Sequence, residues 1–349
     1  MRELFKELKT LISIESPTGK EKKIADYQEA FYKKLGFFVK RIKNNLLVRV
    51  YSKKSSPKIL LIGHLDTVPP EGKAGFFPKE TKSRIYGRGA VDMKAGIACM
   101  NLLAKEIKKG KRPWSSLEFV FYEGEETSLP NGMTFLLKKK LIKGDLALIL
   151  EPTDRKVQIG CLSRFLIKAK IKGKSSHSAY PWRGKNPLLE LEKIIKKISQ
   201  RKYQKVKYKN FYFWNTFSLV KIETPNATNV IPPFCEIYLD LRQDPRKKKN
   251  EIKNEVKKII GEKNSFIIKD ESPGFILKKE PPLFKKLFPE EKKEVFQAWS
   301  DIAQIYHFTK IPAVNFGPGK IEYAHSANEN IEKKEFKDFY KLLKKKILS

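Results

Sequence analysis

The sequence has 349 residues, and its 73 lysines and arginines outnumber its 39 aspartates and glutamates, which gives a formal net charge of +34 at pH 7. This length is enough for about two domains with sizeable cores. No apolar run approaches the length of a membrane-spanning helix, so no membrane partner is expected.

The cellular location is expected to be the cytoplasm. Apolar residues near the N-terminus follow the spacing of one helix face rather than that of a signal peptide. The cysteines Cys99, Cys161 and Cys235 are widely spaced, which fits a reducing compartment better than a disulfide or zinc-knuckle framework.

The positive charge raises the alternative of a basic nucleic-acid-binding protein, because a basic surface favours phosphate binding. Lysine supplies most of this charge, and it is spread along the chain and mixed with glutamate, as in residues 251–258. A solvated lysine-rich surface explains this pattern better, and we expect no nucleic-acid partner. Such a surface is also typical of heat-adapted proteins, a hypothesis that a mesophilic melting temperature would contradict.

The N-terminal third is predicted to combine helices with strands. Helical periodicity over residues 3–35 is interrupted at 16–21, where Thr18 and Glu21 predict a capping box for the second helix. The buried face of that helix is expected to contain Ile24, Tyr27, Phe31 and Leu35. A strand is expected at 46–50, and an apolar helical stripe that follows Asp92 ends at Gly110.

Four apolar strands are each followed by possible metal ligands. Residues 58–63 lead to His64 and Asp66, 117–122 to Glu125 and Glu126, 146–150 to Glu151, and 311–316 to His325. Ligands in open α/β sheets bind beyond the carboxyl ends of the strands, so these side chains should meet at one edge. Asp92, between a glycine turn and a helix start, is interpreted as a bridge between two metal ions. The Asp66 carboxylate is expected to contact the second ring nitrogen of His64.

After Glu151 the pattern becomes that of an inserted α+β domain. Strand-like alternation over 157–171 precedes a helix that begins with the N-cap Asn186 and Pro187. Strands at 217–222 and 235–242 and a helix over 252–260 follow. The predicted domains are a catalytic domain formed by residues 1–162 and 274–349, with the insert at 163–273.

Several motifs give these features a family context. They are GHLDTVPP (63–70), YGRGAVDMKAG (86–96), GEET (124–127), LEPT (150–153), SSHSAYPWRGKNP (175–187), NVIP (229–232) and AHSANE (324–329). In this order the chain resembles the dinuclear zinc aminoacylase and carboxypeptidase family nearly end to end, and most closely its desuccinylase branch. The resemblance implies an α/β fold, in which a mixed-sheet zinc hydrolase domain carries an inserted α+β dimerisation domain.

The resemblance also implies roles for the ligands. Asp92 would bridge two zinc ions, with His64 and Glu151 on one and Glu126 and His325 on the other, and cobalt or manganese could replace zinc in one site. Glu125 would be the general base, supported by Asp66 as a further catalytic residue. A cis peptide is implied between Asp92 and Met93. His177 would stabilise the oxyanion in the active site of the second subunit of a homodimer.

The substrate implied is a small N-acyl amino acid, with N-succinyl-LL-2,6-diaminopimelate as the first choice. N-acetylornithine deacetylation and N-acyl-lysine hydrolysis are the alternatives. Arg242 matches an arginine that binds the substrate carboxylate, and Asn229 matches a neighbouring amide contact. The segment 161–163 departs from the pattern of arginine and glycine found in many desuccinylases, and Arg164 would compensate. Gly317 and Gly319 are expected to line the substrate site through their backbone.

Overall fold

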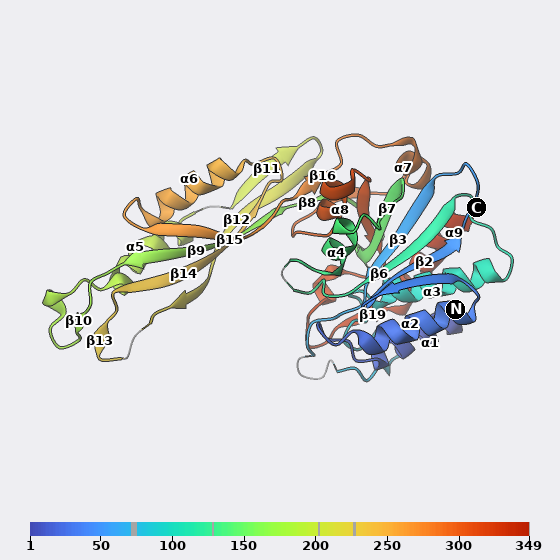
Figure 1. Cartoon of the computed structure of the whole chain (residues 1–349), viewed down its shortest axis with the longest axis horizontal. Helices are drawn as coiled ribbons and strands as arrows, with labels where there is room; N and C mark the ends of the chain where they lie inside the picture. The colour runs from blue at the N-terminus through green and yellow to red at the C-terminus, as the bar shows by residue number, and fades with distance from the viewer. Residues whose placement is uncertain (71–74, 128, 202, 226–227, 349) are drawn as a thin grey trace. The chain divides into compact units, whose positions relative to one another are not determined.

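The computed structural model describes residues 1–70, 75–127, 129–201, 203–225 and 228–348. The chain forms two compact units (Figure 1). The first contains Met1–Ile159, Leu277–Glu294 and Gln304–Ser349, and the second contains Gly160–Ile276 and Val295–Ala303. The sequence places the insert at 163–273 and does not anticipate that 295–303 joins it. None of the helices in the described ranges is long and apolar enough to cross a membrane.

The first unit is built on a mixed sheet whose central strands are parallel. Strands β6, β3, β7 and β18 run in one direction, whereas β1, β2 and β8 pair with their neighbours in antiparallel fashion. The buried apolar runs of β3, β6 and β7 are typical of strands covered on both faces. In sheet order the strands are β1 (Phe38–Ile42), β2 (Asn45–Tyr51), β6 (Ser116–Tyr122), β3 (Lys58–His64), β7 (Leu146–Pro152), β18 (Ala313–Gly317) and β8 (Val157–Cys161).

Two short elements extend this sheet from β8: β17 (Lys293–Phe296), and β16 (Phe275–Ile276), which pairs with the end of β8 that belongs to the second unit. A separate small sheet joins β4 (Lys79–Glu80), β5 (Arg84–Tyr86) and β19 (Asn330–Glu332). It brings the segment before Asp92 beside the segment after His325.

Helices α1, α2 and α3 gather on one side of the main sheet (Figure 1). α3 packs against α1 and α9 and against strands β2, β3 and β7, which explains why it is buried on nearly every side. The helices that lie within the first unit are α1 (Arg2–Ser13), α2 (Lys22–Lys34), α3 (Lys94–Lys108), α4 (Gly132–Lys138), α7 (Pro282–Leu287), α9 (Lys333–Leu348) and the 3₁₀ turn Ile321–Tyr323; α8 (Ile302–Thr309) begins at its boundary.

Two local predictions for α2 are wrong. The hydroxyl of Thr18 donates to Asp66 rather than capping the helix, and the Glu21 carboxylate accepts from the backbone N–H of Gly19. The residues buried by the helix are Ile24, Ala25, Gln28 and Tyr32. The face is therefore rotated from the predicted one, because an i, i+4 row starting at Ile24 meets the sheet.

The second unit is an antiparallel sheet covered on one face by two helices. The stretch predicted as one alternating strand over 157–171 divides into β8 and β9, and β11 and β15 were not predicted. Asn186 caps α5 by accepting from the N–H of Leu188, as predicted, with Pro187 in the first turn. In sheet order the strands are β11 (Gln204–Tyr208), β12 (Phe211–Glu223), β14 (Phe234–Gln243), β9 (Ser163–Lys172) and β15 (Ser265–Ser272); the helices are α5 (Pro187–Ser199) and α6 (Lys249–Ile260). A two-stranded ladder pairs β10 (Ser176–His177) with β13 (Val230–Ile231), and Pro181–Arg183 forms a 3₁₀ turn.

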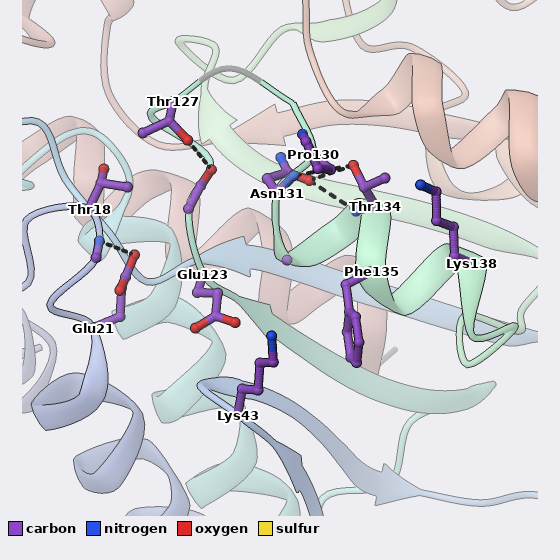
Figure 2. Close-up of a pocket in the computed structure, with 13 residues that line it drawn as sticks. Thr18, Glu21, Lys43, Glu123, Thr127, Pro130, Asn131, Thr134, Phe135 and Lys138 are labelled. Atoms are coloured by element: carbon purple, nitrogen blue, oxygen red, sulfur yellow. Dashed lines mark hydrogen bonds between the residues drawn. The ribbon is translucent and has the colours of Figure 1, made fainter.

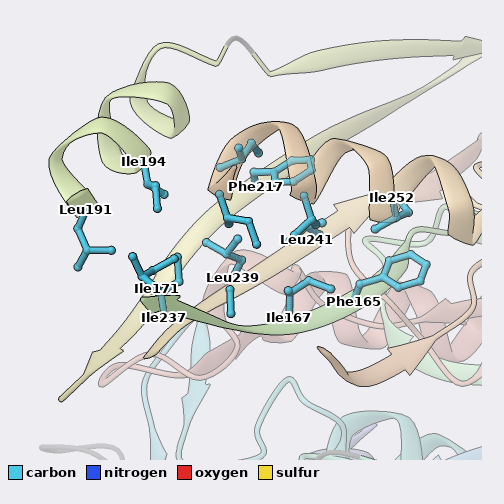
Figure 3. Close-up of a cluster of buried hydrophobic side chains, with 14 of the residues drawn as sticks. Phe165, Ile167, Ile171, Leu191, Ile194, Phe217, Ile237, Leu239, Leu241 and Ile252 are labelled. Carbon is cyan, nitrogen blue, oxygen red and sulfur yellow. The ribbon is translucent and has the colours of Figure 1, made fainter. Parts of the chain in front are cut away.

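The core of the second unit follows from the alternation of β9 and β14. Every second residue of each strand is buried, including Phe165 and Ile167 on β9 and Leu239 and Leu241 on β14 (Figure 3). These side chains form one cluster with apolar residues of α5 and α6, such as Ile252. The opposite face of the two strands keeps the charged residues that the sequence places between the apolar ones.

Candidate metal centre

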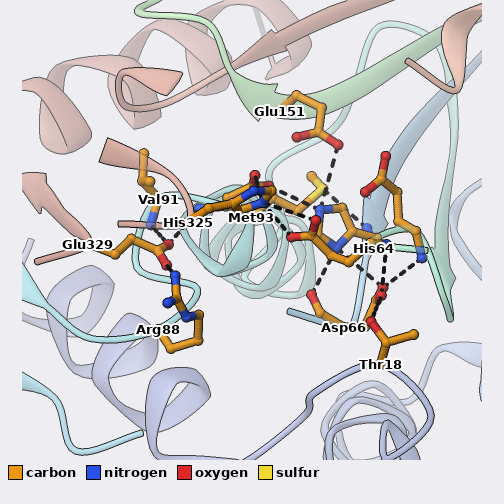
Figure 4. A network of polar contacts seen from close by, with 12 residues as sticks. Thr18, His64, Asp66, Arg88, Val91, Met93, Glu151, His325 and Glu329 are labelled. Carbon is orange, nitrogen blue, oxygen red and sulfur yellow. Dashed lines mark hydrogen bonds and ion pairs between the residues drawn. The ribbon is translucent and has the colours of Figure 1, made fainter. Parts of the chain in front are cut away.

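Asp92 lies at the centre of a cluster of acidic and histidine side chains in the first unit. Figure 4 labels His64, Asp66, Glu151 and His325 of this cluster. Its buried carboxylate faces two imidazoles: Oδ1 is 3.1 Å from Nε2 of His64, and Oδ2 is 3.3 Å from Nε2 of His325. The Asp92–Met93 peptide bond is cis, as the resemblance implies. A carboxylate whose two oxygens face two different nitrogen ligands has the arrangement needed to bridge two metal ions.

Two glutamates complete the two sides of this carboxylate. Glu151, on β7, places Oε1 3.7 Å from Nε2 of His64, and Glu126 places a carboxylate oxygen 3.0 Å from Nε2 of His325. Ligand atoms of His64, Asp92 and Glu126 all lie within 4.8 Å of one another, so these three residues form a possible metal-binding group. The nitrogen and oxygen donors are those that zinc accepts in proteins.

The electrostatics of the cluster favour positive charge. Burial and the charge of Asp92 raise the pKa of Glu151 and Glu126. Burial also acts to raise the pKa of Asp92, but hydrogen bonds from His325 and His64 outweigh it and hold this pKa below its usual value. The contacts with Asp92 and Glu126 raise the pKa of His325 to about 10. The carboxylates thus repel one another and attract a cation, which a divalent metal ion would supply in place of protons on the histidines.

Asp66 anchors both ends of the cluster. Its carboxylate lies 3.5 Å from Nδ1 of His64, the contact that the sequence predicts, and its backbone carbonyl is closer to the same nitrogen, at 2.9 Å. The carboxylate also accepts from the backbone N–H groups of Glu125 and Glu126, at 2.9 and 3.0 Å, and from the Thr18 hydroxyl at 2.8 Å. Asp66 therefore orients the His64 ring through its carbonyl and fixes the Glu125–Glu126 backbone through its carboxylate.

Gly317 and Gly319 form a loop that the cluster requires to be glycine. A Cβ atom on Gly317 would lie 2.3 Å from the carbonyl oxygens of Leu150 and Glu151, and Gly319 has a φ of +85°. Their N–H groups donate to Thr153 Oγ1 and to the Glu335 carboxylate. These N–H groups are therefore engaged within the protein, and the glycines allow β18 to approach β7. That Gly317 and Gly319 line the substrate site through their backbone stays a prediction.

Four predicted site residues belong to the second unit. Arg164 on β9 and Arg242 on β14 stand directly opposite each other, and each donates its Nε–H to the Asp240 carboxylate, at 2.9 and 2.8 Å. His177 is exposed on β10, and its Nδ1 accepts from the N–H of Ala179. Asn229 is exposed in a turn, and its carbonyl accepts from the N–H of Ser178.

A pocket of about 430 Å³ lies beside the loop that carries Glu125 (Figure 2). Its walls carry charges of both signs, with Glu21 and Glu123 beside Lys43. Among the described residues that line it, none is a predicted metal ligand. The pocket is therefore separate from the cluster, although Thr18 contributes to both.

Sequence reasoning missed two buried residues next to Asp92. Glu329 accepts hydrogen bonds from the backbone N–H groups of Val91 and Asp92 and from the Arg88 guanidinium. Both charged side chains lie inside motifs quoted above, and their opposite charges were the available signal.

The fold and this donor set define a metal-dependent amidohydrolase. The sequence profile described as Peptidase family M20/M25/M40 matches residues 60–349. The chain belongs to this family, which sets aside the alternative of a non-enzymatic nucleic-acid-binding protein.

In sequence, the chain is 30% identical to a succinyl-diaminopimelate desuccinylase of Corynebacterium glutamicum, over 96% of this chain and 93% of the relative. It is 29% identical to a putative succinyl-diaminopimelate desuccinylase of Mycobacterium tuberculosis, over 92% of this chain and 91% of the relative.

Solved structures confirm the fold. A tripeptidase of Staphylococcus aureus superposes with a TM-score of 0.83 at 24% identity, covering 99% of this chain and 97% of that one. A structure from Bacillus subtilis, described as a dinuclear metal-binding peptidase of the M20 family, gives a TM-score of 0.74 at 12% identity, covering 99% and 96%.

Proposed function

We propose that this protein hydrolyses the N-acyl amide of a small amino acid, with N-succinyl-LL-2,6-diaminopimelate as the substrate and succinate and LL-diaminopimelate as the products. The observation that carries the hydrolytic chemistry is the Asp92 carboxylate, whose oxygens face His64 and His325 with a glutamate beside each imidazole. The names of the two desuccinylase relatives support the substrate. The reaction belongs to the supply of lysine and of peptidoglycan precursors, and we place it in the cytoplasm.

Two zinc ions are proposed at this cluster, one held by His64 and Glu151, the other by Glu126 and His325, with Asp92 shared. When bound, such ions polarise an amide carbonyl and lower the pKa of a water molecule from 15.7 to about 7. Cobalt or manganese in one of the two sites would serve the same purpose.

Glu125 is the proposed general base. The Asp66 carboxylate accepts from the backbone N–H of Glu125 and from that of Glu126, which fixes the two residues beside each other. In this role the Glu125 carboxylate accepts the proton of the attacking water and then passes it to the nitrogen of the leaving amine. One side chain thus transfers the proton that the water loses to the amine that leaves.

His177 is proposed to donate a hydrogen bond to the oxyanion in the active site of a second copy of the chain. Its Nδ1 accepts an N–H from Ala179, which leaves the proton of the neutral ring on Nε2 and makes Nε2 a donor. A homodimer through the second unit is supported by the exposed apolar side chains of α5, with Leu188 41%, Leu189 70% and Ile195 43% exposed. Replacing Leu189 by Glu should yield monomers in sedimentation experiments and a loss of turnover, because His177 could then no longer reach the active site of a second copy.

The acyl group is proposed to be recognised through arginine. Arg164 and Arg242 flank Asp240 on adjacent strands, and each uses Nε–H for it. Within the described residues, no hydrogen bond is found for the terminal nitrogens of Arg242, whereas Nη1 of Arg164 also lies 3.4 Å from Asp270. Two guanidinium groups in register suit an anionic substrate such as a succinyl amide better than a neutral acetyl group. Asn229, exposed in its turn, is proposed as a neighbouring amide contact.

The test is zinc-dependent amine release from N-succinyl-LL-diaminopimelate, N-acetylornithine and N-acetyllysine, measured side by side. The proposal expects a marked preference in kcat/KM for the first. Arg164→Gln should reduce that preference by raising the KM for the succinyl substrate. The matched control is Lys170→Gln, a basic residue on the same strand that has no acidic partner among the described residues. A preference for either acetyl compound would be consistent with the proposed metal chemistry but would assign the enzyme to arginine or lysine metabolism instead.

A further inference from the structure

A buried ion pair stands directly behind Asp92. Arg88 and Glu329 are each only 1% exposed, and Nη1 of Arg88 lies 2.8 Å from Oε2 of Glu329. The other carboxylate oxygen, Oε1, accepts from the backbone N–H groups of Val91 and Asp92, both at 3.1 Å. Glu329 is therefore bonded to the backbone of the proposed bridging residue, and not to its carboxylate. Figure 4 shows Glu329 beside Arg88 and Val91.

The same glutamate belongs to the segment that carries the opposite ligand. Glu329 lies four residues after His325, and its carbonyl accepts from the N–H of Gly87. Next to it, β19 pairs with β5, placing Asn330 opposite Tyr86. The side chain and main chain of Glu329 thus join the turn that presents Asp92 to the segment that presents His325.

This arrangement is costly for stability alone. In the described part of the chain, no hydrogen-bond partner is found for Nε and Nη2 of Arg88, although both atoms are buried. A buried ion pair with incomplete hydrogen bonding returns little net stability, because desolvation of both charges opposes their attraction. The burial of Arg88 with a single carboxylate partner has an explanation if the Glu329 carboxylate must be kept charged and fixed in one position.

We propose that Glu329, locked by Arg88, is a positioning residue that fixes the backbone of Asp92 so that its two carboxylate oxygens face His64 and His325 at once. The inference rests on the metal site proposed above and adds to it the element that sets the spacing between the two halves. Glu329 touches neither substrate nor metal in this role, and it acts through Asp92.

The test compares Glu329→Gln with a matched control. Glutamine retains an oxygen for the two N–H groups but turns an amide NH₂ toward Arg88, donor against donor. The control, Glu118→Gln, breaks the 3.1 Å ion pair with Lys58 in the same unit. Both residues lie near the N-terminal ends of β6 and β3, whereas the metal ligands lie at the carboxyl ends. Zinc affinity is measured by competition with a chelator, and the Co²⁺-substituted proteins are compared by their visible absorption spectra.

Glu329→Gln should weaken binding of at least one metal ion by roughly 10 to 100-fold, the range typical of outer-shell partners, and change the Co²⁺ spectrum. With both sites saturated, kcat should fall while KM changes little; Glu118→Gln should match the wild type in all three readouts. Arg88→Lys, which keeps the charge, should lose less affinity than Arg88→Met. The comparison of these two Arg88 variants also provides a second test if the near-ultraviolet circular dichroism of Glu329→Gln differs from that of the wild type, which would indicate altered packing.

Two results are distinguishable. A wild-type protein that binds no metal at Asp92 would overturn the proposed function itself. A wild type that binds two ions, with Glu329 and Arg88 variants that bind both with unchanged affinity and spectrum even if they unfold more easily, would reduce the pair to a structural role and overturn this inference.

Discussion

Replacing Gly317 by alanine should damage the metal centre through the backbone of β7. The new Cβ would lie 2.3 Å from the carbonyl oxygens of Leu150 and Glu151, about 0.7 Å inside the 3.0 Å that real Cβ atoms keep. Because both obstacles are backbone atoms, no side-chain rotation relieves the overlap, and β18 must move away from β7. The shift also disturbs the bonds between Gly317 and Thr153, at 3.1 and 3.2 Å.

The cost can be added from these contacts. Overpacking of a buried position costs about 1–3 kcal/mol, and two weakened hydrogen bonds add about 1 kcal/mol each. We therefore expect the free energy of unfolding to fall by roughly 3–5 kcal/mol, a large share of the stability of a typical domain. Glu151 should move with its carbonyl, so the zinc affinity of its half of the site should fall as well.

Urea unfolding and zinc competition measure the two effects. The control is Gly75→Ala, whose Cβ would meet nothing among the described residues closer than Phe77 Cδ2 at 3.6 Å, and which should change stability by less than about 0.5 kcal/mol. Stability of Gly317→Ala within that same margin of the wild type would show that the overlap is relieved at little cost, and would refute the reasoning. Reduced stability with unchanged zinc affinity would refute only its link to Glu151.

Three further predictions concern the proposed base, the metal ions and one buried acid. Glu125→Gln should keep its metal content by elemental analysis and lose on the order of 10² to 10⁴ in turnover; wild-type turnover would remove Glu125 from the role of base. Stripping metal with a chelator should lower the melting temperature, and zinc at about 1,000 times its Kd should restore about 4 kcal/mol of stability, whereas a melting temperature indifferent to zinc would contradict the site. Burial raises the pKa of Glu335 to about 7, so between its ordinary value of 4.5 and about 7 the folded state binds more protons than the unfolded state, and the free energy of unfolding should fall as pH rises through this window. Urea unfolding at about pH 5 and about pH 8 should show a smaller difference for Glu335→Gln than for the wild type, and equal differences would exclude Glu335 as its source.

The convergence of the metal ligands could be predicted because it depends on chain direction alone. Parallel apolar strands end at the same edge of a sheet, so ligands placed at the ends of β3 and β7 and just after β6 meet wherever those strands pair. The prediction needs only the positions of the strands, and their long apolar runs indicate these clearly. The meeting of His64 with Glu126 and Glu151 at one edge of the sheet follows from this rule.

Contacts that depend on three-dimensional detail could not be predicted. The contact of the Asp66 carboxylate with His64 follows from their spacing in the sequence, but its bonds to the N–H groups of Glu125 and Glu126 depend on the loop after β6. The rotation of α2 depends on which residues meet the sheet rather than on the period of the helix. The Arg88–Glu329 pair forms only because β5 and β19, far apart in the sequence, lie side by side.

The proposed metal ligands and the proposed substrate-binding arginines belong to different units. Every proposed metal ligand and the proposed base belong to the first unit, whereas Arg164 and Arg242, the proposed acyl-group readers, lie on β9 and β14 of the second. The metal centre depends on glycines and buried acids that tolerate little change. The arginines lie on the face of their sheet opposite the apolar core, where substitutions leave that core intact. A change at Arg164 should therefore alter which acyl group is cleaved and leave zinc affinity and stability near those of the wild type, a separation that the paired substrate and metal assays would show directly.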